Sequence, residues 1–183
     1  MIIFMGVAGA GKSVQGKLLA DTLALPWLST GEFLRMLISG EQRKEMLSGK
    51  LLDDQQIIAL VRKIFSVVDT DHEFVLDGFP RSTPQADWLL GEVRYGQLQV
   101  SAVIHLLASE DAVTRRLMER GRQDDTEASI RERFQEFEES IKPILEQFRT
   151  SNIPVCDIDA EQTPQEVHQS IIEALEKIRV HEG

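Results

Sequence analysis

The sequence predicts a three-layer α/β fold, in which helices cover both faces of a five-stranded parallel sheet. Short apolar runs, typical of strands that are buried on both faces, recur between longer segments with a helical period. The two patterns alternate along the chain, as they do where right-handed crossovers connect parallel strands. With 183 residues, 42% of them hydrophobic, the chain is long enough for one well-cored domain and too short for two ordinary ones.

Five apolar runs are the expected strands, and they lie at residues 1–5, 27–29, 73–77, 100–108 and 153–158. Two helices have clear signals between and after them. Thr163 is followed by proline and then by Glu166, which is a capping-box pattern at the start of the last helix. Residues 126–149 carry an apolar helical stripe, and we expect Pro143 to kink this helix. Residues 30–60 look helical throughout and are too long for a simple crossover, so we expect a helical flap at the carboxyl edge of the sheet.

Composition excludes several classes of function. The net charge of −10 argues against a protein that mainly binds nucleic acid or an anionic membrane, because both need a basic face. The lone Cys156 cannot form an internal disulfide, which fits a reducing compartment. No signal peptide precedes Gly6, and no apolar run is long enough to span a membrane. We therefore expect a cytoplasmic protein that binds neither nucleic acid nor membrane.

A glycine-rich motif follows the first apolar run. Gly6, Gly11, Lys12 and Ser13 match the pattern G-x-x-x-x-G-K-[ST], directly before a helix. Small residues let the backbone wrap a phosphate, the lysine supplies a cation, and the helix N-terminus adds its dipole. Glycines at a strand-to-helix turn can also be simple turn chemistry. The complete motif in this context predicts a loop that holds the phosphates of a nucleoside triphosphate.

A second motif, "FVLDGFPR", ends the third apolar run. The strand delivers Asp77 to the carboxyl edge of the sheet, where its carboxylate can hold a magnesium-bound water, and Arg81 follows within reach of a phosphate. Asp77 could instead only cap the turn before Gly78.

Arginines form the third part of the predicted site. Arg116 and Arg120 are four residues apart on a predicted helix and share one face; Arg122 and Arg133 follow the helix break at Gly121. Such a set is usually a solvated surface. Beside a phosphate loop it favours phosphoryl transfer, which depends on positioning and on cations that neutralise the moving group.

With these motifs the chain resembles the adenylate kinase family of nucleoside monophosphate kinases, in its short-lid form. The resemblance rests on "GVAGAGKSVQGK", "STGEFLR", "SGKLLDD", "LDGFPRSTPQA" and "RGRQDD" followed by "IRERF", in this order over about 130 residues. It implies a P-loop NTPase-type fold and transfer of the terminal phosphoryl group of MgATP to AMP, which gives two ADP. It also implies one domain, 1–183, with a core (1–29, 60–119 and 127–183), a monophosphate-binding flap (30–59) and a short lid (120–126).

The resemblance further implies roles for individual residues. The ATP-binding residues would be Gly9, Ala10, Gly11, Lys12, Ser13, Val14, Arg116, Arg120 and Gln162. The AMP-binding residues would be Thr30, Arg35, Lys50, Leu51, Leu52, Gly78, Phe79, Arg81, Gln85, Arg122 and Arg133. The catalytic cations would be Lys12, Arg81, Arg120, Arg122 and Arg133. Ser13 and Asp77 would hold magnesium, partly through water, in a monomer without structural zinc.

The chain departs from the family pattern in its phosphate loop and lid. Ala8 stands where the family usually has proline, Ser13 and Val14 stand for Gly-Thr, Glu32 stands for Asp, and the lid is shorter than usual. The loop is closer to that of sugar-acid kinases of the gluconate kinase type. A kinase for UMP or CMP, a sugar-acid kinase, an inactive nucleotide sensor and a coiled-coil interaction protein are the alternatives.

Overall fold

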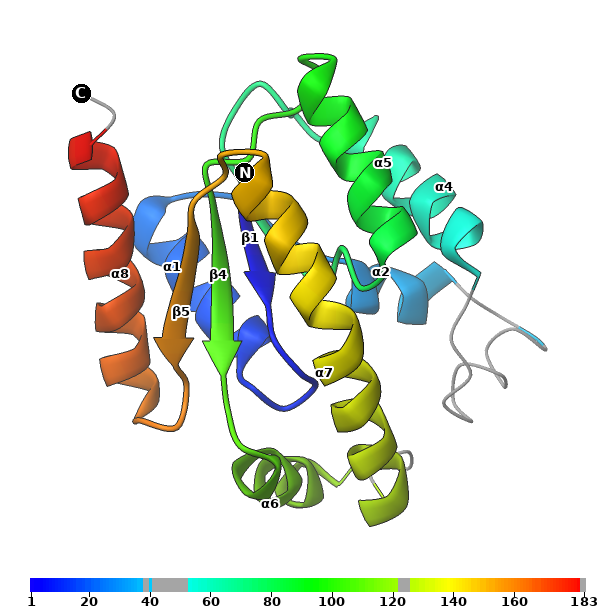
Figure 1. Ribbon diagram of the computed structural model, residues 1–183, viewed down its shortest axis with the longest axis vertical. Coiled ribbons are helices and arrows are strands. Elements are labelled where there is room, and N and C mark those ends of the chain that lie inside the picture. The colour runs from blue at the N-terminus through cyan, green and yellow to red at the C-terminus, as the bar shows by residue number, and fades with distance from the viewer. Residues whose placement is uncertain (38–39, 41–52, 122–125, 182–183) are drawn as a thin grey trace.

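Five parallel strands form a single sheet in the computed structural model, which describes residues 1–37, 40, 53–121 and 126–181 (Figure 1). The strands are β1 (Ile2–Met5), β2 (Trp27–Ser29), β3 (Val75–Asp77), β4 (Ala102–Leu107) and β5 (Val155–Asp159). Their order across the sheet is β2-β3-β1-β4-β5. Each lies within or against one of the five apolar runs, and the predicted fold class is confirmed.

The central strand β1 explains why the predicted runs are apolar throughout. Ile3 pairs with Leu76 on one side and with Val103 on the other, and side chains of β1 alternate between two cores. Ile3 lies in the cluster on one face, and Ile2 lies in the cluster on the other. Both faces of the strand therefore exclude water, and an unbroken hydrophobic run is the result.

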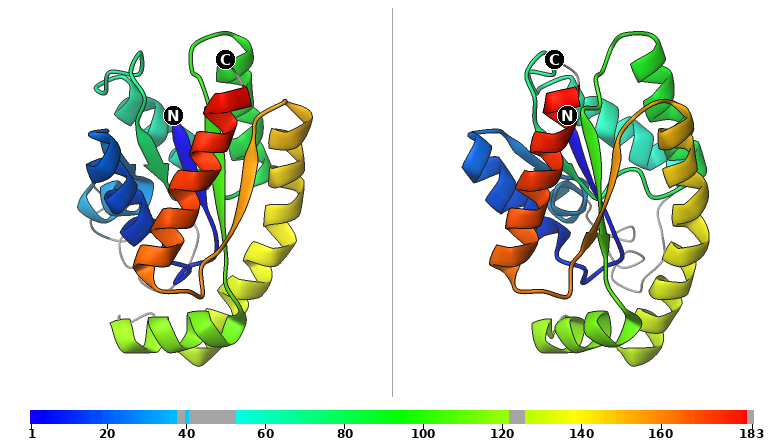
Figure 2. Two further views of the ribbon diagram at one scale, coloured as in Figure 1. Left: turned by 90° about the vertical axis from the view of Figure 1, so that its left-hand side faces the viewer. Right: turned by 60° about the vertical axis from the view of Figure 1, so that its left-hand side comes forward.

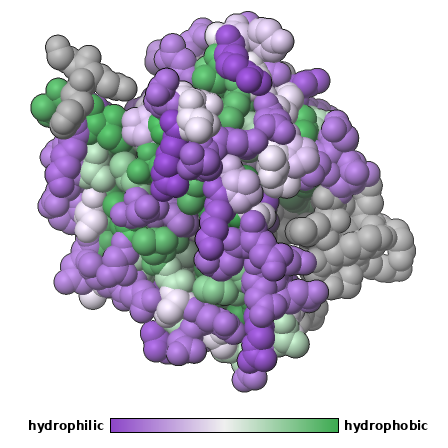
Figure 3. Space-filling view, viewed as in Figure 1, coloured by the Kyte–Doolittle hydropathy of each residue, from purple (hydrophilic) through white to green (hydrophobic). Residues whose placement is uncertain are grey.

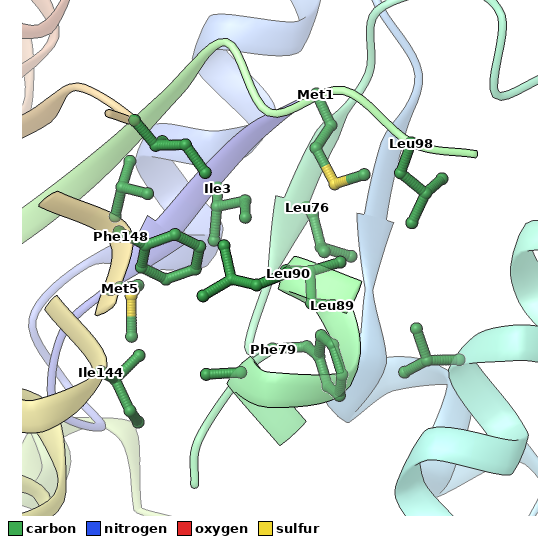
Figure 4. Close-up of a cluster of buried hydrophobic side chains, with 14 of the residues drawn as sticks. Met1, Ile3, Met5, Leu76, Phe79, Leu89, Leu90, Leu98, Ile144 and Phe148 are labelled. Carbon is green, nitrogen blue, oxygen red and sulfur yellow. The ribbon is translucent and has the colours of Figure 1, made fainter. Parts of the chain in front are cut away.

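Helices pack on both faces of this sheet. They are α1 (Lys12–Leu23), α2 (Thr30–Leu37), α4 (Asp54–Phe65), α5 (Thr83–Arg94), α6 (Glu110–Arg120), α7 (Glu127–Thr150) and α8 (Pro164–His181). Figure 2 shows α1 and α8 on one face of the sheet and α7 on the other. On the second face, side chains of α5 and α7 meet β1 and β3 in the cluster that Figure 4 draws, around Phe79, Leu89 and Phe148. None of the described helices has the length and hydrophobicity that a membrane crossing requires.

Two helix N-termini and one helix C-terminus are capped by local hydrogen bonds. At α8, Thr163 N–H and Oγ1 both donate to Glu166 Oε2, at 3.0 and 2.6 Å, so the predicted capping box is confirmed. At α7, Thr126 and Ser129 exchange two such bonds, from Ser129 N–H to Thr126 Oγ1 and from Thr126 N–H to Ser129 Oγ. The helix α6 ends at Gly121, whose N–H bonds to the carbonyl of Leu117.

Two other predictions concern helices. Pro143 lies inside α7, which continues through it as one helix to Thr150. The predicted flap contributes α2 and the start of α4, while residues 38–39 and 41–52 lie outside the described residues. Helix α4 runs across the predicted flap boundary at residue 59, and its buried Ile58, Val61 and Ile64 pack in the core.

The surface seen in Figure 3 is mostly hydrophilic, in line with the high charge of the chain. Hydrophobic side chains gather on this face between α8 and α7, over β4 and β5. His105 Nδ1 of β4 lies 2.7 Å from Asp157 Oδ1 of β5, and Arg149 of α7 lies 3.5 Å from the other oxygen of that carboxylate. This polar group links α7 to the edge strand of the sheet.

Candidate active site

The phosphate loop connects β1 to α1 at the carboxyl edge of the sheet. Lys12 Nζ donates to the carbonyl oxygens of Gly6 and Val7, at 2.6 and 2.9 Å, so the lysine lies over its own loop. Gly9 has a positive φ of 91°, and a Cβ there would lie 2.9 Å from Leu117 of α6. The loop is therefore packed tightly against the helix that carries Arg116 and Arg120.

Asp77 faces this loop from the neighbouring strand β3. Its carboxylate is almost fully buried and accepts a hydrogen bond of 2.6 Å from Ser13 Oγ. The parallel pairing of Phe4 with Asp77 brings the ends of β1 and β3 together, so the two motifs meet although 64 residues separate them in the sequence. The side chain of Asp77 is directed at Ser13, and a carboxylate beside a hydroxyl is the oxygen-rich donor set that magnesium prefers.

Positive charge is concentrated around this carboxylate. Burial lowers the pKa of Lys12 to about 8; Asp77 opposes this change, and Arg81 and Arg120 add to it. Burial likewise lowers the pKa of Arg81, against the effect of Asp77 and with a smaller contribution from Arg133. Lys12 therefore lies within electrostatic reach of Asp77, Arg81 and Arg120, and Arg81 lies within reach of Asp77 and Arg133. An anionic ligand would relieve the repulsion between these cations.

Thr30 and Arg81 converge on Gly78 beside this cluster. Thr30 Oγ1 donates to the carbonyls of Asp77 and Gly78, at 3.2 and 2.9 Å, and Arg81 Nε donates to the carbonyl of Gly78 at 2.8 Å. Thr30 is the first residue of α2, directly after β2, and Arg81 comes from the loop after β3. The sheet order makes β2 and β3 neighbours, which brings these two predicted AMP ligands together.

Gln85 lies deeper, with 5% of its surface exposed. Its Oε1 accepts from the backbone N–H of Arg81 at 2.8 Å, and its Nε2 donates to Asp54 Oδ1 at 2.7 Å. Ser82 Oγ donates to the same oxygen of Asp54 at 2.7 Å. The side chain of Phe79 is fully buried and packs edge-on against Trp88, so only the backbone of Phe79 can reach a ligand.

Several predicted ligands are not fully described. Lys50, Leu51, Leu52 and Arg122 lie outside the described residues. Arg35 lies within α2, in the turn after Thr30 and Glu32. These residues stay predictions.

The loop between β5 and α8 is held from several sides near Arg116. Arg116 Nη2 donates to the carbonyl of Ala160 at 2.7 Å, and Gln162 Nε2 donates to Asp159 Oδ2 at 3.2 Å. From α1, the buried Gln15 donates through Nε2 to the carbonyl of Pro164 at 2.8 Å. The segment around Gln162, which is predicted to bind ATP, is thus tied directly to the helix that follows the phosphate loop.

Sequence reasoning did not find three of these polar residues. Asp54 and Gln15 are described above, and Glu161 Oε1 accepts from the backbone N–H of Ser109, the N-cap residue of α6. Hydrogen bonds from the backbone and the side chain of Ser109 lower the pKa of Glu161. Asp54 stands in the quoted "SGKLLDD" segment, but no spacing rule connects it with Gln85.

A cavity of about 300 Å³ opens at the same edge of the sheet, on the side of α7. His105, Leu107, Phe137, Glu138 and Asp159 line it with five further residues. None of the predicted nucleotide ligands is among its lining residues, so the cavity lies beside the site and the chemistry lies elsewhere.

The fold and site together define a P-loop phosphotransferase, in which a phosphate loop and a group of arginines meet at the carboxyl edge of a parallel sheet. The family model described as adenylate kinase matches residues 4–153, and the chain belongs to the adenylate kinase family.

Relatives resemble the chain over nearly its whole length. The adenylate kinase of Corynebacterium urealyticum is 36% identical over 182 residues, which cover 96% of this chain and 99% of the relative. That of Rhodopirellula baltica is 38% identical over 181 residues, which cover 95% and 94%. Adenylate kinase 1 of a Nostoc species is 33% identical over 172 residues, which cover 91% and 93%.

Proposed function

We propose that this chain is an ATP:AMP phosphotransferase, which moves the terminal phosphoryl group of ATP to AMP and gives two ADP. The observation that carries the proposal is the meeting of Lys12 and Arg81 at Asp77 beside the phosphate loop, with Arg120 near Lys12 and Arg133 near Arg81. Phosphoryl transfer needs little covalent help from a protein. It needs two substrates held in line and cations that neutralise the charge on the moving group.

Lys12 would follow the phosphoryl group during transfer. In the free protein its Nζ is held by two loop carbonyls, which are weaker partners than phosphate oxygens. Arg81 approaches the same region from β3 and would contact the phosphate of AMP. The attacking oxygen of AMP is already anionic, so the reaction requires no general base.

Magnesium would enter with ATP and be held near Ser13 and Asp77, whose oxygen atoms already lie 2.6 Å apart. When bound, the ion would neutralise charge on the phosphates of ATP. Ser13 would have to turn its hydroxyl hydrogen away from Asp77, since its oxygen would then act as a ligand.

Gln85 and Thr30 support AMP as the acceptor. The amide of Gln85 offers one donor and one acceptor, which together match the N1 and N6 edge of adenine. Kinases of this family that act on UMP or CMP usually carry Asn and Ala at these positions, as the resemblance implies. We therefore place the monophosphate between α2 and the loop after β3.

The flap (30–59) and the lid (120–126) would close over the two substrates. Closure would exclude water, which otherwise competes with AMP for the phosphoryl group. Helix α4 packs in the core through Ile58, Val61 and Ile64, so this end of the flap would stay with the core.

The test is a coupled assay of ADP production with MgATP and a panel of AMP, UMP, CMP, GMP, dTMP and gluconate, with a blank that contains no acceptor. Turnover largely confined to AMP supports the proposal. Preferential turnover of UMP, CMP or gluconate would overturn it in favour of the corresponding kinase. Tight ATP binding without turnover of any acceptor would identify a nucleotide sensor.

A further inference from the structure

Asp54 is hydrogen-bonded to Gln85, the residue that we expect to read the base of the acceptor. It is the first residue of α4, the helix that leads back from the flap into the core. Its Oδ1 accepts from Gln85 Nε2 and from Ser82 Oγ, both at 2.7 Å. A half-buried carboxylate oxygen thus joins α4 to the first turn of α5.

These hydrogen bonds leave the Gln85 amide only one orientation. A carboxylate oxygen can only accept, so the group that faces Asp54 must be the NH₂. A backbone N–H can only donate, so the group that faces Arg81 N must be the oxygen. A flipped amide would set two acceptors against each other at Asp54 and two donors against each other at Arg81.

The fixed orientation decides which base the amide can pair with. Each partner uses one of the two hydrogen-bonding positions of its group, so one N–H and one oxygen lone pair remain. Adenine offers an N6 donor beside an N1 acceptor, which match this pair. Hypoxanthine and guanine offer an O6 acceptor beside an N1 donor, and these would match only the flipped amide.

We propose that Asp54 is a positioning residue that selects adenine over 6-oxopurines in the monophosphate site by fixing the orientation of Gln85. The inference rests on the proposed function, because it assumes that Gln85 faces the base of the acceptor. Asp54 also connects base reading to the flap. The acceptor oxygen belongs to the first residue of α4, so Gln85 is held in its reading orientation only while α4 stays docked on α5.

The experiment compares kcat/KM for AMP with kcat/KM for IMP in the intact protein and in Asp54→Ala. In Asp54→Ala, Gln85 loses its hydrogen bond to a charged group, which lowers the ratio of kcat/KM for AMP to kcat/KM for IMP about tenfold. The KM for AMP rises, whereas the KM for ATP stays unchanged, because Asp54 accepts hydrogen bonds from Ser82 and Gln85, neither of which is a predicted ATP ligand. Asp54→Asn retains an oxygen that can accept from Gln85 and restores most of the ratio.

Asp53→Ala is the matched control. Asp53 is the neighbouring carboxylate, and its Oδ1 accepts from Gln55 N–H at 2.7 Å as the N-cap of α4, without contact to Gln85. The Asp53→Ala variant loses the same charge and the same atoms as Asp54→Ala. Its ratio of kcat/KM for AMP to kcat/KM for IMP stays at the level of the unaltered protein. Asp54→Glu keeps the charge but displaces the oxygen, so it replaces Asp54→Ala if that variant does not fold.

The outcomes separate this inference from the proposed function. An unaltered ratio in Asp54→Ala, in a protein that phosphorylates AMP, overturns the role of Asp54 alone. An equal loss in Asp54→Asn and Asp54→Ala also overturns it, since charge rather than orientation would then be decisive. An unaltered protein that does not phosphorylate AMP overturns the proposed function itself.

Discussion

The substitution Gly78→Ala tests whether Thr30 and Arg81 lie at the monophosphate. The φ of Gly78 is +86°, and a Cβ there would lie 2.8 Å from Arg81 Nη2 and 2.8 Å from Thr30 Oγ1. Both side chains also donate to the carbonyl of Gly78. In Gly78→Ala the methyl group therefore occupies the space between the two predicted AMP ligands.

The magnitude follows from two contributions. The left-handed backbone costs about 1–2 kcal/mol for a residue with a Cβ. Arg81 can swing its flexible end away at little cost in stability, but it then loses a hydrogen bond of about 1 kcal/mol and leaves its place in the site. We expect the free energy of unfolding to fall by about 2–3 kcal/mol. A displacement of about 1 Å in a positioning group lowers kcat/KM for AMP about 100-fold.

Gly96→Ala provides the control for backbone strain. Gly96 has a φ of +69°, follows the end of α5, and has no atom within 4 Å of the position that a Cβ would take. It should lose a similar 1–2 kcal/mol of stability and keep its activity. The assay measures chemical denaturation and ADP formation for both variants. Equal activity of folded Gly78→Ala and folded Gly96→Ala would refute the placement of Thr30 and Arg81 at the monophosphate.

Three further predictions concern Lys12, Arg81 and Cys156. Lys12→Ala and Arg81→Ala should each lose several kcal/mol of transition-state stabilisation, measured as kcat/KM, and near-normal turnover in either would contradict the assignment. Because the pKa of Lys12 is about 8 in the free protein and phosphates favour its charged form, ATP binding above pH 8 must take up a proton. Affinity measured by calorimetry should therefore fall as pH rises above 8, and a slope that persists in Lys12→Ala would point to another group. Burial and Asp157 raise the pKa of the Cys156 thiol, so alkylation by iodoacetamide at pH 7.5 should be slower in the native than in the urea-unfolded protein; equal rates would show that the thiol is not protected.

The sequence predicted the parts of this fold whose signals are local. The central strand β1 is a continuous apolar run because both of its faces are buried, whereas the edge strand β5 also carries the exposed Asp157 and Asp159. The capping box at Thr163 lies within four residues. The phosphate loop and Asp77 each follow a strand directly. Since parallel strands end at the same edge, their meeting could also be expected.

Contacts between distant segments gave no such signal. The bond from Gln15 to Pro164 spans 149 residues and that from Gln85 to Asp54 spans 31, and no periodicity connects either pair. In the sequence, Asp54 resembles any acidic residue in the first turn of a helix, and it does occupy such a position in α4. Its second role depends on how α4 packs on α5, which only the assembled core determines.

The end of α6 and the start of α7, which flank the lid, allow the length of the lid to change. Gly121 closes α6 and the Thr126 capping box closes α7, each through hydrogen bonds within its own helix. These caps at the last turn of α6 and the first turn of α7 are formed by residues that the structure describes. Doubling the length of such a connection costs only about 0.6 kcal/mol of closure entropy. Insertions and deletions can therefore accumulate between Gly121 and Thr126 while the sheet and the phosphate loop stay unaltered, and a longer lid could be grafted at the same two residues.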